Sequence, residues 1–185
     1  MRKMFIKTLV SEAKLNPDIW LLCGDLGYSV LEEFSDTFPE RFLNVGVAEQ
    51  NMVGVATGLA LSGKVVFVYS IGNFATFRCL EQIRNDACYH KANVKIVAVG
   101  GGLSYGAQGY THHAIEDLAV MRSLPGITIF APGDPIETEF ATRAISNLEG
   151  PAYLRLGKAG EPNLHCEKAK LEVGKCARLL DGNDA

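Results

Sequence analysis

The chain has 185 residues, of which 48% are hydrophobic, and its formal net charge is −3 at pH 7. That length and composition suit one globular domain with a full core, followed by a short tail. The chain has no basic stripe and no apolar run near the roughly 18 residues of a membrane span, which argues against nucleic acid and membranes as partners.

Apolar runs without strict alternation are typical of buried strands, and stretches with helical periodicity separate them. In chain order, the pattern predicts a helix over 3–15, strands over 19–25 and 42–47, a helix over 48–62, a strand over 65–70, a helix over 74–90, a strand over 94–102, a helix over 114–123, a strand over 127–132, a helix over 134–147 and a strand over 151–156. We therefore expect an α/β fold, with a mainly parallel sheet covered by helices on both faces. Ligands of such sheets bind at the carboxyl ends of the strands.

The alternating pattern ends near residue 157, which predicts one domain over 1–157. Residues 158–185 are expected to be a linker and the start of a further domain. The polar stretch GKAGEPNLHCEKAK, which starts at Gly157, is followed by LEVGKCARLLDGNDA, which resembles the start of a strand and turn. We expect the chain to end where a further domain would begin, as in a fragment or a short split subunit.

The five cysteines are scattered along the chain and form no CxxC pair. An odd, scattered set is typical of free thiols in a reducing compartment. We therefore expect a cytoplasmic protein.

The stretch RFLNVGVAEQNMVGVATGLALSG, at 41–63, carries one carboxylate, Glu49, at the start of a helix of mainly small and apolar residues. Small residues let a helix pack closely against its neighbours. A carboxylate in the first turn is stabilised by the helix dipole, which is one interpretation. The other is a buried acid for proton transfer, because desolvation raises the pKa of a carboxyl group. Position alone does not decide between them.

Two further stretches follow in order: YSIGNFATF at 69–77 and THHAIEDLAVMRSLPGITIFAPGDPIE at 111–137. Together with 41–63, this ordered set resembles the pyrimidine-binding domain of the transketolase family, over about residues 5–165. That family includes deoxyxylulose-phosphate synthase and the beta subunits of 2-oxoacid dehydrogenases. The resemblance implies the thiamine-diphosphate-binding fold, with 1–157 as its pyrimidine domain and a site for thiamine diphosphate.

The resemblance also implies which residues meet the cofactor. Glu49 would hydrogen-bond a ring nitrogen of the aminopyrimidine and favour its imino tautomer, whose nitrogen takes the thiazolium proton. Phe74 would stack on the aminopyrimidine and Phe77 would line its pocket, although core packing explains both rings equally well. Ile71 stands where transketolases have another aromatic residue, and Asp25 matches an aspartate near the cofactor at the subunit interface. For Asp25 a turn or helix cap is the alternative.

On the substrate side, the resemblance places His112 where it would hydrogen-bond oxygens that gain charge during carbon–carbon cleavage. The alternative is that His112 and His113 stabilise their loop. No zinc-type spacing surrounds them, and we expect no metal ligands in this chain. Ser29 falls near a serine that touches the substrate phosphate, and Lys158 falls where transketolases place a phosphate-binding arginine. A loop serine and a linker lysine are the alternatives.

Two positions depart from the family pattern. Transketolases have a histidine where this chain has Gly100, and an aspartate where it has Gln108, and both family residues contact sugar hydroxyls. Glycine is expected to open space, and glutamine can both donate and accept hydrogen bonds. We therefore expect poor use of xylulose 5-phosphate as donor, and a preference for a differently substituted ketose or a 2-oxoacid.

The family holds the cofactor's diphosphate through Mg²⁺ and a GDG…N segment on a separate domain, and this chain has no such segment. The prediction is a homodimer that completes its site with a diphosphate-binding domain or subunit, which also holds the Mg²⁺. The expected reaction is transfer of a two-carbon ketol unit, and the chain alone is expected to be inactive.

Three alternatives remain open. The first is deoxyxylulose-phosphate-synthase-like or 2-oxoacid-dehydrogenase-like chemistry. The second is a noncatalytic domain that keeps the fold, against which the joint presence of Glu49, Phe74 and His112 argues. The third is a nucleotide-binding domain with GGGLSYG as its phosphate loop, but that loop lacks the GxGxxG spacing.

Overall fold

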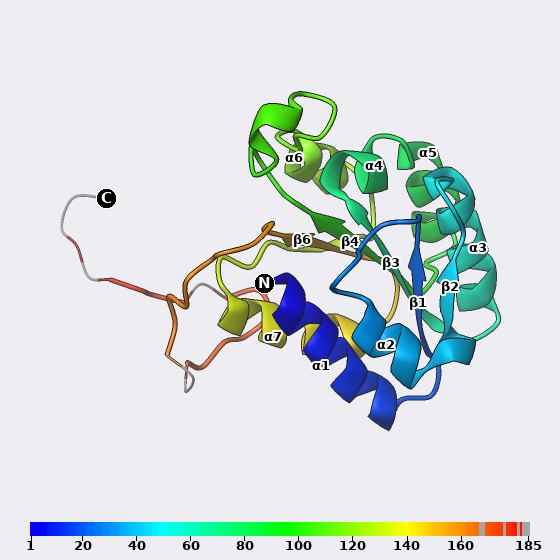
Figure 1. The fold of residues 1–185 in the computed structure, drawn as a ribbon, viewed down its shortest axis with the longest axis horizontal. Helices are drawn as coiled ribbons and strands as arrows, with labels where there is room; N and C mark the ends of the chain where they lie inside the picture. The colour runs from blue at the N-terminus through cyan, green and yellow to red at the C-terminus, as the bar shows by residue number, and fades with distance from the viewer. Residues whose placement is uncertain (167–168, 176, 181, 183–185) are drawn as a thin grey trace.

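The computed structural model describes residues 1–166, 169–175, 177–180 and 182. Its centre is a six-stranded sheet with the strand order β2-β1-β3-β4-β6-β5, in which every neighbouring pair is parallel (Figure 1). The strands are β1 Ile19–Cys23, β2 Phe42–Asn44, β3 Val65–Ile71, β4 Val94–Val99, β5 Thr128–Phe130 and β6 Ala152–Leu156. The predicted α/β fold with a parallel sheet is confirmed, and each strand predicted within residues 1–157 is present.

The helices lie in the connections between the strands, as a parallel sheet requires, because each crossover must return the chain to the end where the previous strand began. They are α1 Arg2–Leu15, α2 Glu32–Thr37, α3 Glu49–Leu61, α4 Gly72–Thr76, α5 Leu80–Gln82, α6 Asp117–Arg122 and α7 Pro135–Ser146. Two 3₁₀ turns, Pro39–Arg41 and Gly106–Gln108, and a π-helical turn, Ile83–Cys88, complete the described elements. No helix among the described residues is long and apolar enough to cross a membrane.

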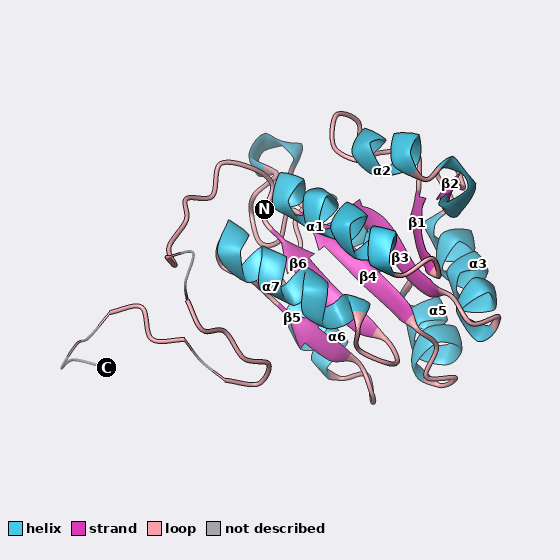
Figure 2. Cartoon of the chain, turned by 90° about the horizontal axis from the view of Figure 1, so that it is seen from below, coloured by secondary structure: helices cyan, strands magenta, loops and turns pink. Residues whose placement is uncertain are grey.

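Helices cover both faces of the sheet (Figure 2). One core lies under α1, α2 and α7, and the other lies under α3 to α6. Strand β3 serves both, because Phe67 and Tyr69 point into the first core while Val66 and Val68 point into the second. Burial on both faces explains why this strand is a continuous apolar run without alternation.

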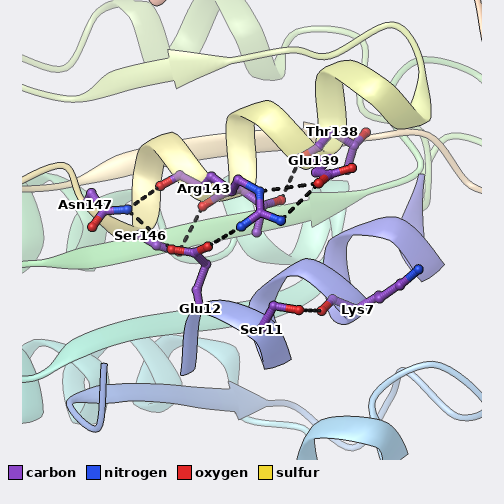
Figure 3. A network of polar contacts seen from close by, with 9 residues as sticks. Lys7, Ser11, Glu12, Thr138, Glu139, Arg143, Ser146 and Asn147 are labelled. Atoms are coloured by element: carbon purple, nitrogen blue, oxygen red, sulfur yellow. Dashed lines mark hydrogen bonds and ion pairs between the residues drawn. The ribbon is translucent and has the colours of Figure 1, made fainter. Parts of the chain in front are cut away.

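A network of polar contacts joins α1 to α7 on the first face (Figure 3). Glu12 on α1 accepts a hydrogen bond from Arg143 Nη1 at 2.6 Å and one from Asn147 Nδ2 at 3.4 Å. Arg143 also pairs with Glu139, four residues earlier on its own helix, at 3.0 Å. These contacts fix the two helices side by side on the sheet.

Three details of the predicted elements are wrong. The helix expected over 74–90 is broken into α4, α5 and the π-helical turn. The Thr76 hydroxyl donates to the Gly72 carbonyl at 2.7 Å and the Cys79 thiol lies 3.2 Å from the Phe74 carbonyl, so side chains compete with backbone donors there. Helix α2 was not predicted, and the strand expected after residue 170 is absent from the described parts of that segment.

A lysine lies in the centre of the sheet. Lys95 on β4 is completely buried, and its Nζ donates to the carbonyls of Leu148 and Gly150, both at 2.6 Å. Burial lowers the pKa of Lys95 to about 7. The side chain therefore pins the turn between α7 and β6 to the sheet.

Candidate active site at the carboxyl ends of the strands

Glu49 begins α3, and only 2% of it is exposed. Its Oε2 accepts a hydrogen bond from Arg78 Nη1 at 2.7 Å. The end of β1 runs close by, because a Cβ added at Gly24 would come within 3.5 Å of the Glu49 Cγ and 3.3 Å of the Gly46 carbonyl. The carboxylate is thus enclosed by backbone on one side and paired with a cation on the other, unlike a solvent-exposed capping residue.

Arg78 contacts two of the residues expected to meet the cofactor. Besides pairing with Glu49, its guanidinium carbon lies 4.5 Å from the centre of the Phe74 ring. The Arg78 side chain is 44% exposed, whereas that of Glu49 is 1% exposed. A planar group with N–H donors toward the carboxylate and a face toward the phenyl ring therefore fits between Glu49 and Phe74. An aminopyrimidine is planar in the same way, and in its imino tautomer a ring nitrogen carries an N–H that can face a carboxylate.

His112 and His113 have different surroundings. The His112 ring meets the Phe74 ring edge-on at 5.2 Å, and its Nδ1 lies 3.0 Å from the Thr111 hydroxyl. The His113 Nε2 lies 3.0 Å from the Gly106 carbonyl within the same loop. His112 thus joins the Glu49–Phe74 group, and His113 stabilises the loop.

That loop is held against α4 by close contacts. The Asn73 side-chain amide donates to the Thr111 carbonyl at 2.6 Å. Gly72 approaches so closely that an added Cβ would lie 2.7 Å from the Ala114 Cβ. The absence of a side chain at Gly72 therefore lets the histidine loop reach Phe74.

Tyr105 continues the group beyond His112. Its ring lies 5.7 Å from the His112 ring, and Lys158 Nζ lies 4.8 Å from its centre. Partial burial raises the pKa of the Tyr105 hydroxyl. The expectation of open space at Gly100 is wrong, because a Cβ there would come within 2.5 Å of Tyr105 Cδ2. The tyrosine ring fills the volume that a side chain at position 100 would need.

A basic pocket lies at the far end of this line of contacts. It has a volume of about 520 Å³, and Ser29 and Lys158 both line it. Arg2 and Lys3 also line it. These two cations were not predicted from the sequence, which indicated only a helix over 3–15 at this end of the chain.

The remaining predicted residues lie outside the series of contacts that runs from Glu49 to Lys158. Asp25 is exposed, and hydrogen bonds from the Asn44 amide and the Tyr28 hydroxyl lower its pKa. Ile71 ends β3, half-buried, directly before α4. Phe77 lines a separate cleft of about 290 Å³ together with Asn73, Tyr110, His113 and Glu116. Gln108 is exposed on the 3₁₀ turn of its loop.

One cluster outside this site has the composition of a metal ligand set. One ligand atom each of Asp134, Glu137 and His165 lies within 4.8 Å of the others. However, Asp134 Oδ2 already accepts from the backbone N–H groups of Leu164 and His165, both at 2.8 Å, and its Oδ1 accepts from the Glu137 N–H at 2.7 Å. Hydrogen bonds to Asp134 lower its pKa, against the opposing effect of burial. We interpret the cluster as a clasp that ties the linker to the start of α7.

Comparison with known proteins places the chain in a family. The model of the transketolase pyrimidine-binding domain matches residues 1–161. A putative transketolase C-terminal section from Methanocaldococcus jannaschii is 42% identical over 100% of this chain and 59% of that protein. A subunit of an apulose-4-phosphate transketolase from Phocaeicola vulgatus is 40% identical over 99% of this chain and 59% of that protein.

A solved structure described as a split-gene transketolase, inactive beta4 tetramer, superposes with a TM-score of 0.87 at 41% identity. The match covers 98% of this chain and 59% of that one. The chain thus spans about three-fifths of the length of the relatives it matches.

Proposed function

Because the chain belongs to the transketolase family through its pyrimidine-binding domain, we propose that it is the pyrimidine-binding half of a thiamine-diphosphate-dependent enzyme that transfers a two-carbon ketol unit. The observation that carries the proposal is the buried Glu49 carboxylate, 2.7 Å from Arg78 and grouped through it with Phe74. A buried acid beside an aromatic ring suits a nonpolar heterocycle whose ring nitrogen must be held in one protonation state.

Glu49 and Phe74 would hold the aminopyrimidine, and the exposed Arg78 head would move aside into solvent as it binds. When bound, thiamine diphosphate supplies the nucleophilic carbon for cleaving a bond next to a carbonyl. Glu49 would share a proton with a ring nitrogen through its carboxylate oxygen. His112 would donate a hydrogen bond to the substrate oxygen that gains negative charge.

The basic pocket supports a phosphorylated ketose as donor. Arg2, Lys3 and Lys158 bring three positive charges to one cavity, and Ser29 adds a hydroxyl group. A 2-oxoacid without a distal anion would leave that pocket unused. Neither the synthase-like and dehydrogenase-like alternatives nor a noncatalytic domain has a comparable observation in its favour.

The names of two relatives, one a transketolase subunit and one a split-gene transketolase, support a separate diphosphate-binding partner that would also hold the Mg²⁺. Self-association, as a dimer or as a pair of dimers, is supported by the tetramer described for the related structure. On α3, Gly54 and Gly58 have nothing within 4 Å of an added Cβ, which leaves room for a second copy to approach.

The same proposal includes two finer points. A cytoplasmic location is supported by the free thiols of Cys23, Cys79, Cys88 and Cys166. A domain boundary near residue 157 is supported by the end of β6 at Leu156.

The test is a comparison of the chain alone with the chain assembled with its diphosphate-binding partner. With thiamine diphosphate and Mg²⁺, the assembled enzyme should transfer a ketol unit from hydroxypyruvate to an aldehyde acceptor. The chain alone should show no turnover and no sub-micromolar cofactor binding by calorimetry. Absence of transfer by the assembled enzyme, or tight cofactor binding by the chain alone, would contradict the proposal.

A further inference from the structure

Tyr105 lies between the two ends of the candidate site. On one side its ring is 5.7 Å from that of His112, and on the other Lys158 Nζ is 4.8 Å from its centre. Lys158 also lines the basic pocket, whereas His112 touches Phe74. The Tyr105 ring thus lies on the direct route from His112 to Lys158 and the basic pocket.

The ring has a fixed place because of two complementary features of its loop. Gly100 directly follows β4 with a φ of +80°, and an added Cβ there would overlap the Tyr105 ring. The ring is half-buried and has a cation on one face and an imidazole beside it. Cation–π contact and burial both favour one position of an aromatic side chain over a mobile one.

We propose that Tyr105 is a specificity-determining residue that sets how many carbons of the donor fit between the ketol group at His112 and the anionic group in the basic pocket. The inference rests on the proposed ketol transfer. A rigid ring between His112 and the basic pocket fixes the distance that a donor must cover from its ketol group to its anionic group. A donor of the wrong length cannot contact His112 and the cations of the pocket together. Loss of one set of contacts lowers kcat/KM for that donor.

The test uses two donors that differ by one carbinol unit between the ketol group and the phosphate. They are xylulose 5-phosphate and fructose 6-phosphate, assayed with the enzyme assembled with its partner. Hydroxypyruvate is the reference donor, since it has no distal anion and is too short to extend past His112 to Tyr105. Its turnover by the wild type establishes ketol transfer itself, so failure of the proposed function is distinguished from failure of this inference.

Tyr105→Leu should change the ratio of kcat/KM for the two phosphorylated ketoses at least tenfold, in the direction of equal use of both. Tyr105→Phe should leave the ratio within threefold, because it keeps the ring. Hydroxypyruvate turnover is measured in both variants as well, so that an effect of the ring on His112, which would act on all donors alike, is separated from a change in the donor ratio. For a wild-type enzyme that turns over neither ketose, the ratio of their inhibition constants against hydroxypyruvate replaces the ratio of kcat/KM.

Gly100→Ala gives an independent test, because its methyl group would displace the ring. Gly126→Ala is the matched control, since its φ of +82° imposes the same backbone strain while nothing lies within 4 Å of an added Cβ. Gly100→Ala should shift the donor ratio in the same direction as Tyr105→Leu, and Gly126→Ala should not. A ratio that stays within threefold of the wild type in Tyr105→Leu, or an equal loss for all three donors, would overturn the proposal.

Discussion

Arg78→Met should destabilise the chain far more than Glu49→Gln, although both changes break the same ion pair. The Glu49 side chain is 1% exposed and that of Arg78 is 44% exposed. Removing Arg78 leaves a buried carboxylate without its cation, and breaking a buried pair in this way costs about 3–5 kcal/mol. Because the Arg78 head is partly exposed to water, the pair is only half-buried, and we expect the lower end, about 3 kcal/mol.

Glu49→Gln leaves the partner that can reach water. The Arg78 head turns into solvent, and the loss is that of one hydrogen bond, about 1 kcal/mol. In the double variant no charge remains buried, so its stability should match that of Glu49→Gln. The coupling between the two positions is then about 3 kcal/mol, because the Arg78→Met loss disappears once Glu49 is neutral.

Urea unfolding of the isolated chain at one fixed protein concentration measures these differences, with far-ultraviolet circular dichroism as the signal. The fixed concentration matters because the chain is expected to self-associate. Equal destabilisation by the two single changes, or additive effects in the double variant, would refute the assignment of Glu49 as the buried and dependent partner.

Other predictions rest on three particular contacts. Burial lowers the pKa of Lys95 to about 7, below its ordinary value of 10.5, so the unfolded chain binds more protons between these pH values. The free energy of unfolding should therefore rise with pH across that window, by up to roughly 1.4 kcal/mol per pH unit. Urea unfolding at two pH values within the window measures this rise, which should vanish in Lys95→Met. Asp134→Ala removes the cap of α7 and the clasp on the linker, and should cost about 1–2 kcal/mol by thermal unfolding. The exposed Asp36→Ala is its control, and an equal loss there would contradict the clasp. Lys158→Ala should lower kcat/KM for phosphorylated donors by about 10- to 100-fold, because a charge-assisted contact is lost. It should spare hydroxypyruvate, and the same loss in the exposed Lys14→Ala would rule out a local role.

The sheet could be predicted because its strands are short apolar runs between helical patterns, and burial on both faces requires such runs. Glu49 could be recognised as unusual, since it is one carboxylate among small apolar residues, but its position alone left a capping role open. The break after α4 could not be predicted. It depends on the Thr76 hydroxyl and the Cys79 thiol turning back to carbonyls of their own segment.

The parts of the site that lie on loops were also out of reach of the sequence. Tyr105 fills the volume beside Gly100 only because the loop between them turns through glycines with positive φ, and no periodicity encodes that path. Arg2 and Lys158 stand far apart along the chain and meet only after the sheet has formed. Arg78 follows Phe74 by four residues, and this spacing was the available signal that the two side chains could touch.

The measurement that tests the central claim most directly is ketol transfer from hydroxypyruvate by the enzyme assembled with its diphosphate-binding partner, comparing Glu49→Gln with the wild type. A positioned acid–base group contributes about 10²- to 10⁴-fold, so the rate should fall by at least about 10²-fold. Thermal unfolding and assembly with the partner should remain close to those of the wild type. Wild-type turnover in a folded, assembled Glu49→Gln enzyme would show that this carboxylate only stabilises the start of α3.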